Sequence, residues 1–512
     1  MYKPFDIQFG GGLNNKDSDF DIADNQSSDM QNILYDQYKK PQTRPGYTIN
    51  GDDTGNNAIL AFFEYQYDNG SGTITRSIYR AANTIIEKDI AGTWTSVRTG
   101  LTAGLKGEAV QALNSIYYFN GTDTVQKLNN TTWSAVAGIP KGKFAVWHDR
   151  MLFVAGIDAT PYTVKISGDA NNSLDTPENF TGGWGVDAGK NGVYGKITGM
   201  GVVNGKVVVY TERSIHVISG RIPEQMSIDE KSRGIGSVSH RSIASDGSYN
   251  YFQAFDGHVY CFDGNYPYKI SDVIQGTITG MNMGKLSESN AAVFDYKGNK
   301  YLLNFAEGVS NTPNRTIVLE IEKSNLFDRN YKTKSWLYWK GLNSSVMLNS
   351  LVNSVPELYF GEATANTVTY QMFSGISDNG AAIDAYYISK NFDNNNRERD
   401  KKAKYLHITC QAVGDWDINL QYSVDGGEFA ETNPSAINLL AQGATIPFTL
   451  DDPSEAVLGD GFLPTDSAVM IPANYRFIKL KFSNSTLNQY FRVHSMTLYY
   501  RIGKLRRRIN ST

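Results

Sequence analysis

Residues 196–220 read KITGMGVVNGKVVVYTERSIHVISG, and residues 241–264 read RSIASDGSYNYFQAFDGHVYCFDG. Short runs rich in β-branched and aromatic residues alternate here with Asn-Gly and Asp-Gly pairs, which supply the positive φ that tight hairpin turns need. Each stretch predicts an antiparallel meander, and the two together indicate a repeat of about forty residues. The segment Lys196–Gly264 therefore favours a protein built from antiparallel blades.

Similar units fill the chain on both sides of this segment. Strand runs and turn pairs such as Asn120-Gly121 and Lys297-Gly298 recur from about residue 56 to residue 378. Because a four-stranded blade takes about forty residues, this span predicts a β-propeller of six to eight blades. In the third unit we expect the last strand near Asn179-Phe180. A long stacked sandwich is the alternative, since periodicity alone does not establish that a ring closes.

The two ends of the chain have a different character. Residues 1–55 are polar and predict an extended arm, with a short helical spacing in Asp29–Asp36. Such an arm cannot offset its own ordering entropy, so we expect it to pack on the body of the chain or on a neighbouring subunit. Residues 379–512 predict a β-sandwich that includes a strand at Ala444–Leu450 and a long polar loop at Asp393–Lys402. The fold class is therefore all-β.

Composition excludes several classes of protein. A formal net charge of −4 gives no overall electrostatic reason to bind nucleic acid or anionic lipid. The chain has two cysteines, and their separation argues against a disulfide framework, so we expect folding in a reducing cytoplasm. No apolar run reaches the roughly 18 residues that would span a bilayer, and no signal peptide is visible, so membrane insertion is not expected.

A search for catalytic and metal-binding patterns gives weak candidates only. The chain contains no GxxxxGK[ST], HExxH or GxSxG motif, and each of its six histidines stands alone in the sequence. The alternating carboxylates of Asp17–Asp21 resemble a calcium loop but lack its central Gly and distal Glu, so a solvated acidic arm is the favoured interpretation. We expect no enzyme activity, no cofactor and no metal.

Two further patterns have competing interpretations. The segment Ser423–Gly427 is similar to the Asp-box of sialidase-type propellers, but the aromatic residue expected after it is missing, which favours a plain hairpin turn. A basic tail ends the chain. Its cations are candidates for contact with another subunit or with DNA, and they are Lys504, Arg506, Arg507 and Arg508.

Several short segments, taken in order, resemble one family: the tail hub or nozzle proteins of short-tailed double-stranded-DNA bacteriophages, also known as packaged-DNA stabilisation proteins. The resemblance covers most of residues 1–410, and each motif is short, so the order of the motifs carries it. The segments are Gly11–Asn14, Met30–Asn32, Arg44–Tyr47, His148–Gly156, Tyr210–Ile215, Gly234–Val238, Phe255–Tyr260 and Ile270–Asp272.

The resemblance implies a structural virion protein, made in the host cytoplasm and placed in the virion tail. Family members look like propellers on a platform built from the chain ends. They form six-fold rings below the portal and adaptor proteins, carry tail fibres, and retain or conduct double-stranded DNA. The family brings no catalytic residues with it. Two other classes stay open, a glycan-binding or glycan-cleaving propeller and a propeller that acts as a protein-interaction scaffold.

Overall fold

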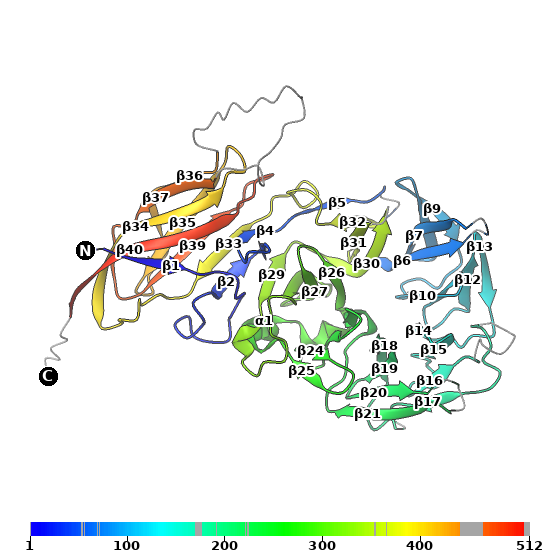
Figure 1. Cartoon of the computed structure of the whole chain (residues 1–512). Helices are drawn as coiled ribbons and strands as arrows, with labels where there is room; N and C mark the ends of the chain where they lie inside the picture. Colours follow the sequence, from blue (N-terminus) through cyan, green and yellow to red (C-terminus); the bar gives the residue numbers. More distant parts are fainter. Residues whose placement is uncertain are drawn as a thin grey trace.

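The computed structural model of the chain describes residues 2–505 except 53–54, 56, 69, 71, 169–176, 191, 221, 223–224, 353–354, 365 and 441–463. It is nearly all β-strand and has two parts, a propeller and a sandwich, drawn on the right and the left of Figure 1. The predicted all-β propeller fold is confirmed.

Seven four-stranded antiparallel sheets form the blades in the described residues. Blade one contains β6 (Ile59–Asp68), β7 (Ile74–Ala82), β8 (Ile85–Ile90) and β9 (Thr93–Arg98). Blade two contains β10 (Glu108–Ala112), β11 (Ser115–Phe119), β12 (Val125–Asn129) and β13 (Thr132–Val136). Blade three contains β14 (Phe144–His148), β15 (Met151–Ala155), β16 (Thr163–Ile166) and β17 (Gly185–Asp187). The expectation of a strand near Asn179-Phe180 is wrong, because the outer strand of blade three is β17.

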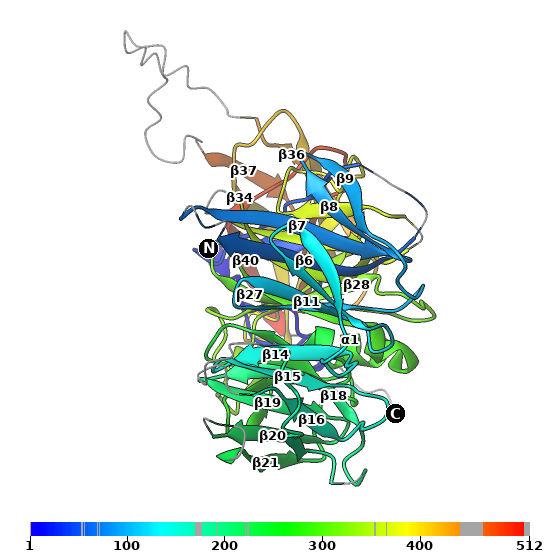
Figure 2. The same ribbon diagram turned by 90° about the vertical axis from the view of Figure 1, so that its right-hand side faces the viewer.

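The next three blades are equally regular. Blade four contains β18 (Ile197–Val203), β19 (Lys206–Thr211), β20 (Ser214–Ser219) and β21 (Ser227–Arg233). Blade five contains β22 (Ala244–Ser245), β23 (Asn250–Gln253), β24 (Val259–Phe262) and β25 (Pro267–Lys269). Blade six contains β26 (Asn290–Asp295), β27 (Asn299–Phe305), β28 (Arg315–Glu320) and β29 (Trp336–Lys340). The Asn204-Gly205 turn joins β18 to β19, with φ of 48° and 68°. Figure 2 looks at the propeller from the side of blades one to four.

The ring closes through the N-terminal arm. Blade seven contains β30 (Ser344–Val352), β31 (Val355–Glu362) and β32 (Thr369–Met372), and its fourth strand is β5 (Tyr47–Ile49). The first strands of successive blades contact one another all the way round, and β30 of blade seven contacts β6 of blade one. These contacts exclude the stacked sandwich as the alternative for this part of the chain.

The rest of the arm packs on its own chain, mostly on the sandwich. Strand β1 (Lys3–Ile7) pairs with β40 (Val493–Leu505), and β2 (Ser27–Gln31) pairs with β33 (Ala385–Ser389). The helical spacing predicted in Asp29–Asp36 is wrong. Residues there form β2 and β3 (Ile33–Tyr35). Consecutive side chains of β3 point to opposite faces of the strand and are all buried, whereas the predicted helix would bury one face only.

The sandwich is one continuous run of strands in the order β1-β40-β34-β37-β36-β35-β39-β33-β2. Its remaining members are β34 (Arg399–Gln411), β35 (Asp417–Val424), β36 (Ala430–Asn438), β37 (Pro464–Met470), β38 (Asn474–Tyr475) and β39 (Ile478–Asn484). The predicted loop at Asp393–Lys402 is wrong for its last four residues, because β34 begins at Arg399. The predicted strand Ala444–Leu450 lies outside the described residues.

One hydrophobic core runs through the sandwich, the arm and blades five to seven. It includes Leu406 and Phe482 of the sandwich, Leu34 of the arm and Trp336 of blade six, each at most 1% exposed. Continuous burial of this kind stabilises a single arrangement of the two parts. No helix of the described residues is long and apolar enough to cross a membrane.

Candidate functional site: the joint and the propeller axis

The first candidate site is the joint between arm, propeller and sandwich, and Arg44 lies at its centre. This guanidinium is fully buried and donates to Asn32 Oδ1 at 3.0 Å, to both carboxylate oxygens of Asp378 at 2.8 and 2.6 Å, and to the carbonyls of Pro45 and Lys340 at 3.0 and 2.8 Å. All five of its N–H groups are thereby satisfied, so it has no donor left for a ligand. Arg44 fastens the arm to the rim of blade six and to the linker that leads to the sandwich.

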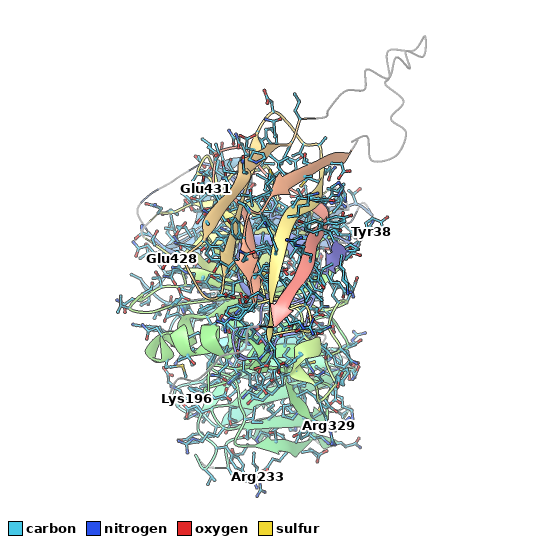
Figure 3. The ribbon with its side chains drawn as sticks, turned by 90° about the vertical axis from the view of Figure 1, so that its left-hand side faces the viewer. Tyr38, Lys196, Arg233, Arg329, Glu428 and Glu431 are labelled. Carbon is cyan, nitrogen blue, oxygen red and sulfur yellow. The ribbon has the colours of Figure 1, made fainter. Side chains whose placement is uncertain are left out.

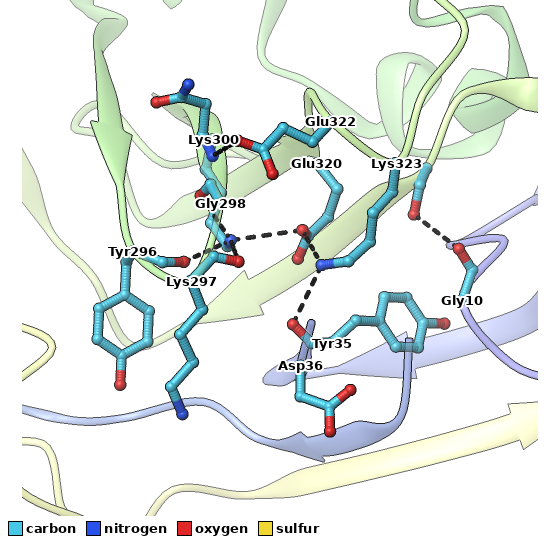
Figure 4. Close-up of polar contacts among 12 residues, drawn as sticks. Gly10, Tyr35, Asp36, Tyr296, Lys297, Gly298, Lys300, Glu320, Glu322 and Lys323 are labelled. Atoms are coloured by element: carbon cyan, nitrogen blue, oxygen red, sulfur yellow. Dashed lines mark hydrogen bonds and ion pairs between the residues drawn. The ribbon is translucent and has the colours of Figure 1, made fainter. Parts of the chain in front are cut away.

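A second buried network holds the arm beside blade six (Figure 4). Lys323 Nζ donates to the carbonyl of Tyr35 at 3.2 Å and to Glu320 Oε2 at 2.5 Å. Lys300 Nζ lies 3.4 Å from the same carboxylate oxygen and donates to the carbonyl of Tyr296 at 2.6 Å. Burial lowers the pKa of the Lys300 ammonium group, while the charge of Glu320 opposes that shift. Lys323 therefore links strand β3 to blade six, and Glu320 holds Lys323 and Lys300 together.

Glycine is required where the arm touches the propeller most closely. Gly12 has a φ of +78°, and a Cβ there would lie 2.5 Å from the backbone nitrogen of Trp336. A Cβ on Gly46 would lie 1.9 Å from the carbonyl oxygen of Ser377. At both positions the backbone of the arm approaches its neighbour too closely for any side chain.

The second candidate site is the end of the propeller axis where the first strands begin. Arg241, in a short 3-10 helix before β22, reaches across this end with a side chain that is 7% exposed. Its Nε donates to Glu108 at 2.6 Å, and its terminal nitrogens donate to the carbonyls of Gly107, Ser345 and Leu60, the first two at 2.7 and 3.2 Å. It thus ties blade five to blades one, two and seven across the axis.

A cavity of about 270 Å³ adjoins Arg241. Two other cations line it, and each has a carboxylate partner: Lys106 Nζ lies 2.7 Å from Glu288, and Lys143 Nζ lies 2.8 Å from Asp158. Burial, together with the charge of Arg241, lowers the pKa of Lys106. Since the cations are neutralised within the protein, this end of the axis offers little net charge to a ligand.

His240 also lines this cavity and is half-buried. Its Nδ1 accepts a hydrogen bond from the backbone nitrogen of Met200 at 3.3 Å, and its ring stacks on Phe144 with centroids 4.9 Å apart. Desolvation lowers the pKa of this imidazole and so favours its neutral form. No hydrogen bond joins it to a nucleophilic side chain in the part of the chain that the structure describes, so the geometry offers no catalytic pair here.

Two serine–histidine contacts escaped the sequence analysis. Ser214 Oγ lies 2.7 Å from His216 Nε2, and Ser271 Oγ lies 2.9 Å from His258 Nδ1. The first pair could have been found from its spacing, because residues two apart on a strand share one face. All four residues are at most 5% exposed and none lines the axial cavity, so both pairs stabilise blade interiors.

The weak candidates from the sequence have ordinary structural roles. Asp17 accepts hydrogen bonds from Tyr331 at 2.7 Å and Asn14 at 3.1 Å, and Asp19 pairs with Lys479 on β39. Burial would raise the pKa of Asp17, but these hydrogen bonds and Lys332 outweigh it and lower that pKa. The carboxylates therefore bind different parts of the protein and do not converge on an ion. No group of three metal-ligating side chains occurs among the described residues.

The similarity of Ser423–Gly427 to an Asp-box does not extend beyond a turn. These residues join β35 to β36, and Asp425 has a φ of 52° while Gly426 has one of 78°. Asp425 Oδ1 accepts from the backbone nitrogens of Arg476 and Phe477, so the carboxylate faces its own domain. The hairpin interpretation is confirmed. Of the basic tail, Lys504 is the last residue but one of β40, whereas Arg506, Arg507 and Arg508 lie outside the described residues.

Comparison with known proteins identifies no family for this chain. No protein-family model matches the chain, and no curated protein matches it. Among solved structures, the chain is similar to the N-terminal domain of Nup159 at 8% identity, over 63% of this chain and 97% of that one, with a TM-score of 0.37. It is also similar to the C-terminal WD40 domain of Sif2 at 11% identity, over 61% of this chain and 81% of that one, with a TM-score of 0.35. A third similar structure is BBS1N in complex with ARL6DN, at 9% identity over 66% of this chain and 99% of that one, with a TM-score of 0.39.

Proposed function

We propose that this chain is a structural protein of a bacteriophage tail, a hub or nozzle subunit that forms a ring below the portal and adaptor proteins. In that ring it conducts or retains double-stranded DNA and carries tail fibres. The proposal rests on the ordered resemblance described above. One structural observation supports it most: three of the resembling segments, around Gly12, Asn32 and Arg44, meet at one buried joint.

The joint gives the chain the properties of a building block. Arg44 and Asp378, 334 positions apart in the sequence, fix the propeller to a platform that both chain ends build. A ring of identical subunits needs rigid, heterologous surfaces, and its contacts close when the rotation between neighbours divides the circle. The side chain of Arg241 crosses the propeller axis. In the proposed assembly, DNA would therefore pass through the centre of the ring of subunits and not through a single propeller.

The proposal is tested by the state of assembly. We expect the purified chain, alone or with its adaptor partner, to form a closed ring of about six copies, measured by light scattering and imaged by electron cryomicroscopy. In the virion the same density should occupy the tail below the adaptor. A stable monomer that never joins a particle would overturn the proposal.

The glycan-directed alternative makes a different expectation. A propeller that binds or cleaves glycans should offer free arginine and carboxylate groups at one end of its axis. Such a cluster exists around Arg241, but its guanidinium is committed to Glu108 and to three backbone carbonyls. A monomer with glycoside hydrolase activity would favour that alternative. A monomer that captures a protein through one exposed face would favour the interaction scaffold.

A further inference from the structure

The outer face of the sandwich carries a group of cations and aromatic rings that no internal contact explains. In the sheet order β1-β40-β34, Arg501 on β40 lies opposite Lys402 on β34, and Tyr499 lies opposite Tyr405. Paired residues of adjacent strands point to the same face of a sheet. We call the set Tyr2, Lys402, Lys404, Tyr405, Tyr499 and Arg501 the basic face. Figure 3 looks onto the sandwich end of the molecule, with Tyr38 on one flank and Glu428 and Glu431 on the other.

The cations of the basic face are exposed and unneutralised. Lys402, Lys404 and Arg501 are all exposed, and none forms an ion pair with a carboxylate in the region that the structure describes. Like charges directly opposite one another on neighbouring strands are destabilising, and Lys402 and Arg501 have this arrangement. The isolated protein therefore gains nothing from the pair, which points to an anionic ligand.

Aromatic rings lie between these cations. Lys404 Nζ is 5.0 Å from the centroid of the Tyr2 ring and 5.3 Å from that of Tyr405. The rings of Tyr405 and Tyr499 have centroids 4.6 Å apart and are tilted by 31°. A sheet surface that combines cations with partly exposed rings is the arrangement that binds nucleic acid strands, because phosphates pair with the cations and bases stack on the rings.

The charge of this sheet changes sign along its strands. Towards the other end, Asp6 on β1 accepts from Thr497 Oγ1 at 2.7 Å, and Asp466 on β37 lies 3.2 Å from His407. The basic end of the sheet is the one at which β34 begins and β40 ends. A local positive region thus stands on a chain with a net charge of −4, and its field would orient an anionic ligand at this end.

We propose that the basic face binds the phosphate backbone of nucleic acid, without sequence preference. Lys402, Lys404 and Arg501 neutralise phosphates, and Tyr405 and Tyr499 contact sugars or unstacked bases. The inference rests on the proposed function for its biological setting, double-stranded DNA in the tail, but binding itself does not require a ring. Among the described residues of this surface, Met470, which lies opposite Tyr405 and is 56% exposed, is the one large exposed apolar side chain, too little to favour insertion into an anionic membrane.

The test measures binding of fluorescent 30-nucleotide DNA of random sequence, single-stranded and duplex, to the full-length protein by anisotropy at 50 to 200 mM salt. The variant Lys402→Gln/Arg501→Gln should bind duplex at least about tenfold more weakly. The slope of log affinity against log salt should fall by about 2, since two phosphate contacts are lost. The control Lys206→Gln/Arg213→Gln changes the charge equally at exposed residues of blade four and should bind as the wild type does.

Different outcomes separate the sources of the phosphate and the two proposals. Tighter binding of single strands, lost in Tyr405→Ala, identifies stacking; equal affinity for duplex identifies backbone contact. Failure of the wild type to bind either DNA at 50 mM salt, an equal loss in the control variant, or binding only to phosphatidylserine vesicles would overturn the inference. Light scattering on the same sample reports ring formation separately, so either proposal can fail without the other.

Discussion

Cations in two regions of this molecule have opposite surroundings. Those at the joint and on the propeller axis, Arg44 and Arg241, are buried and have acceptors on several parts of the chain. Those of the basic face, Lys402 and Arg501, are exposed and oppose each other without a carboxylate partner in the described region. The contrast teaches that charge alone does not mark a binding surface here: a cation whose donors are already used maintains the fold, and one that is left unneutralised is available to a ligand.

The largest effect that would test this contrast is expected at the joint. Arg44→Met leaves the buried Asp378 carboxylate without its partner, so the free energy of unfolding should fall by about 3–5 kcal/mol. Urea unfolding followed by tryptophan fluorescence measures it. Arg329→Met, at an exposed arginine, should change the value by less than about 0.5 kcal/mol. Equal stability of the two variants would show that Arg44 does not fasten the joint.

A smaller loss is expected on the axis. Arg241→Met removes one charged contact and three carbonyl contacts, but Glu108 is 28% exposed and keeps some water, so we expect a loss of about 2–3 kcal/mol. Unfolding in urea measures this too. Proteolysis should then cleave loops near Leu60 and Ser345 faster than in the wild type. A variant as stable as the wild type would mean that ring closure through β5 suffices without the axial arginine.

The part of the pH dependence of stability that His240 alone contributes should be smaller still. Burial lowers the pKa of His240, and also of His216 and His258, below that of an ordinary imidazole near 6.5. Below pH 6.5 the unfolded chain therefore takes up protons that the folded chain does not. Stability is complete above that pH and falls on acidification, by at most about 1.4 kcal/mol per pH unit for each histidine. His240→Phe should reduce this slope, as measured by unfolding at pH 7.5, 6 and 5. An unchanged slope would contradict the assignment.

The smallest effect on stability is expected on the basic face. Lys402→Gln/Arg501→Gln removes a repulsion between opposing like charges, so the free energy of unfolding should stay equal or rise by up to about 0.5 kcal/mol. Thermal unfolding at low salt, where surface charges act most strongly, is the sensitive measurement. A loss of more than 1 kcal/mol would instead give these cations a role in the fold, like that of Arg44.

The propeller was predictable because its determinants are local. Asn204-Gly205 and the Asp-Gly pairs set each turn within a few residues of the strands that they join, so the spacing predicted a propeller of six to eight blades, but not that there would be seven. The arm was not predictable in this way. Strands β1, β2 and β5 find partners hundreds of residues away, and the apolar spacing of Met30, Ile33 and Leu34 fits a helix as well as two short strands that are buried on both sides.

The candidate sites depended on the same distinction. Ser214 and His216 could have been paired from their spacing on one strand. The partnership of Arg44 with Asp378 and that of Arg241 with three blades exist only once the ring has closed. The basic face could not be predicted, because it depends on the register of β40 against β34, and these strands are distant in the sequence. Sequence reasoning proposed only the charged tail, Lys504 to Arg508.

The pairing of β5 with β32 also determines when the propeller can close during translation. A ribosome releases Tyr47–Ile49 long before Thr369–Met372, the strand that receives it, so the arm must wait while six blades emerge. Strand β1 waits longer still, until Val493–Leu505 has left the exit tunnel. The propeller therefore cannot close until Met372 has been released, and the platform cannot form until β40 has been released, so a product truncated before either point exposes strands that lack their partners.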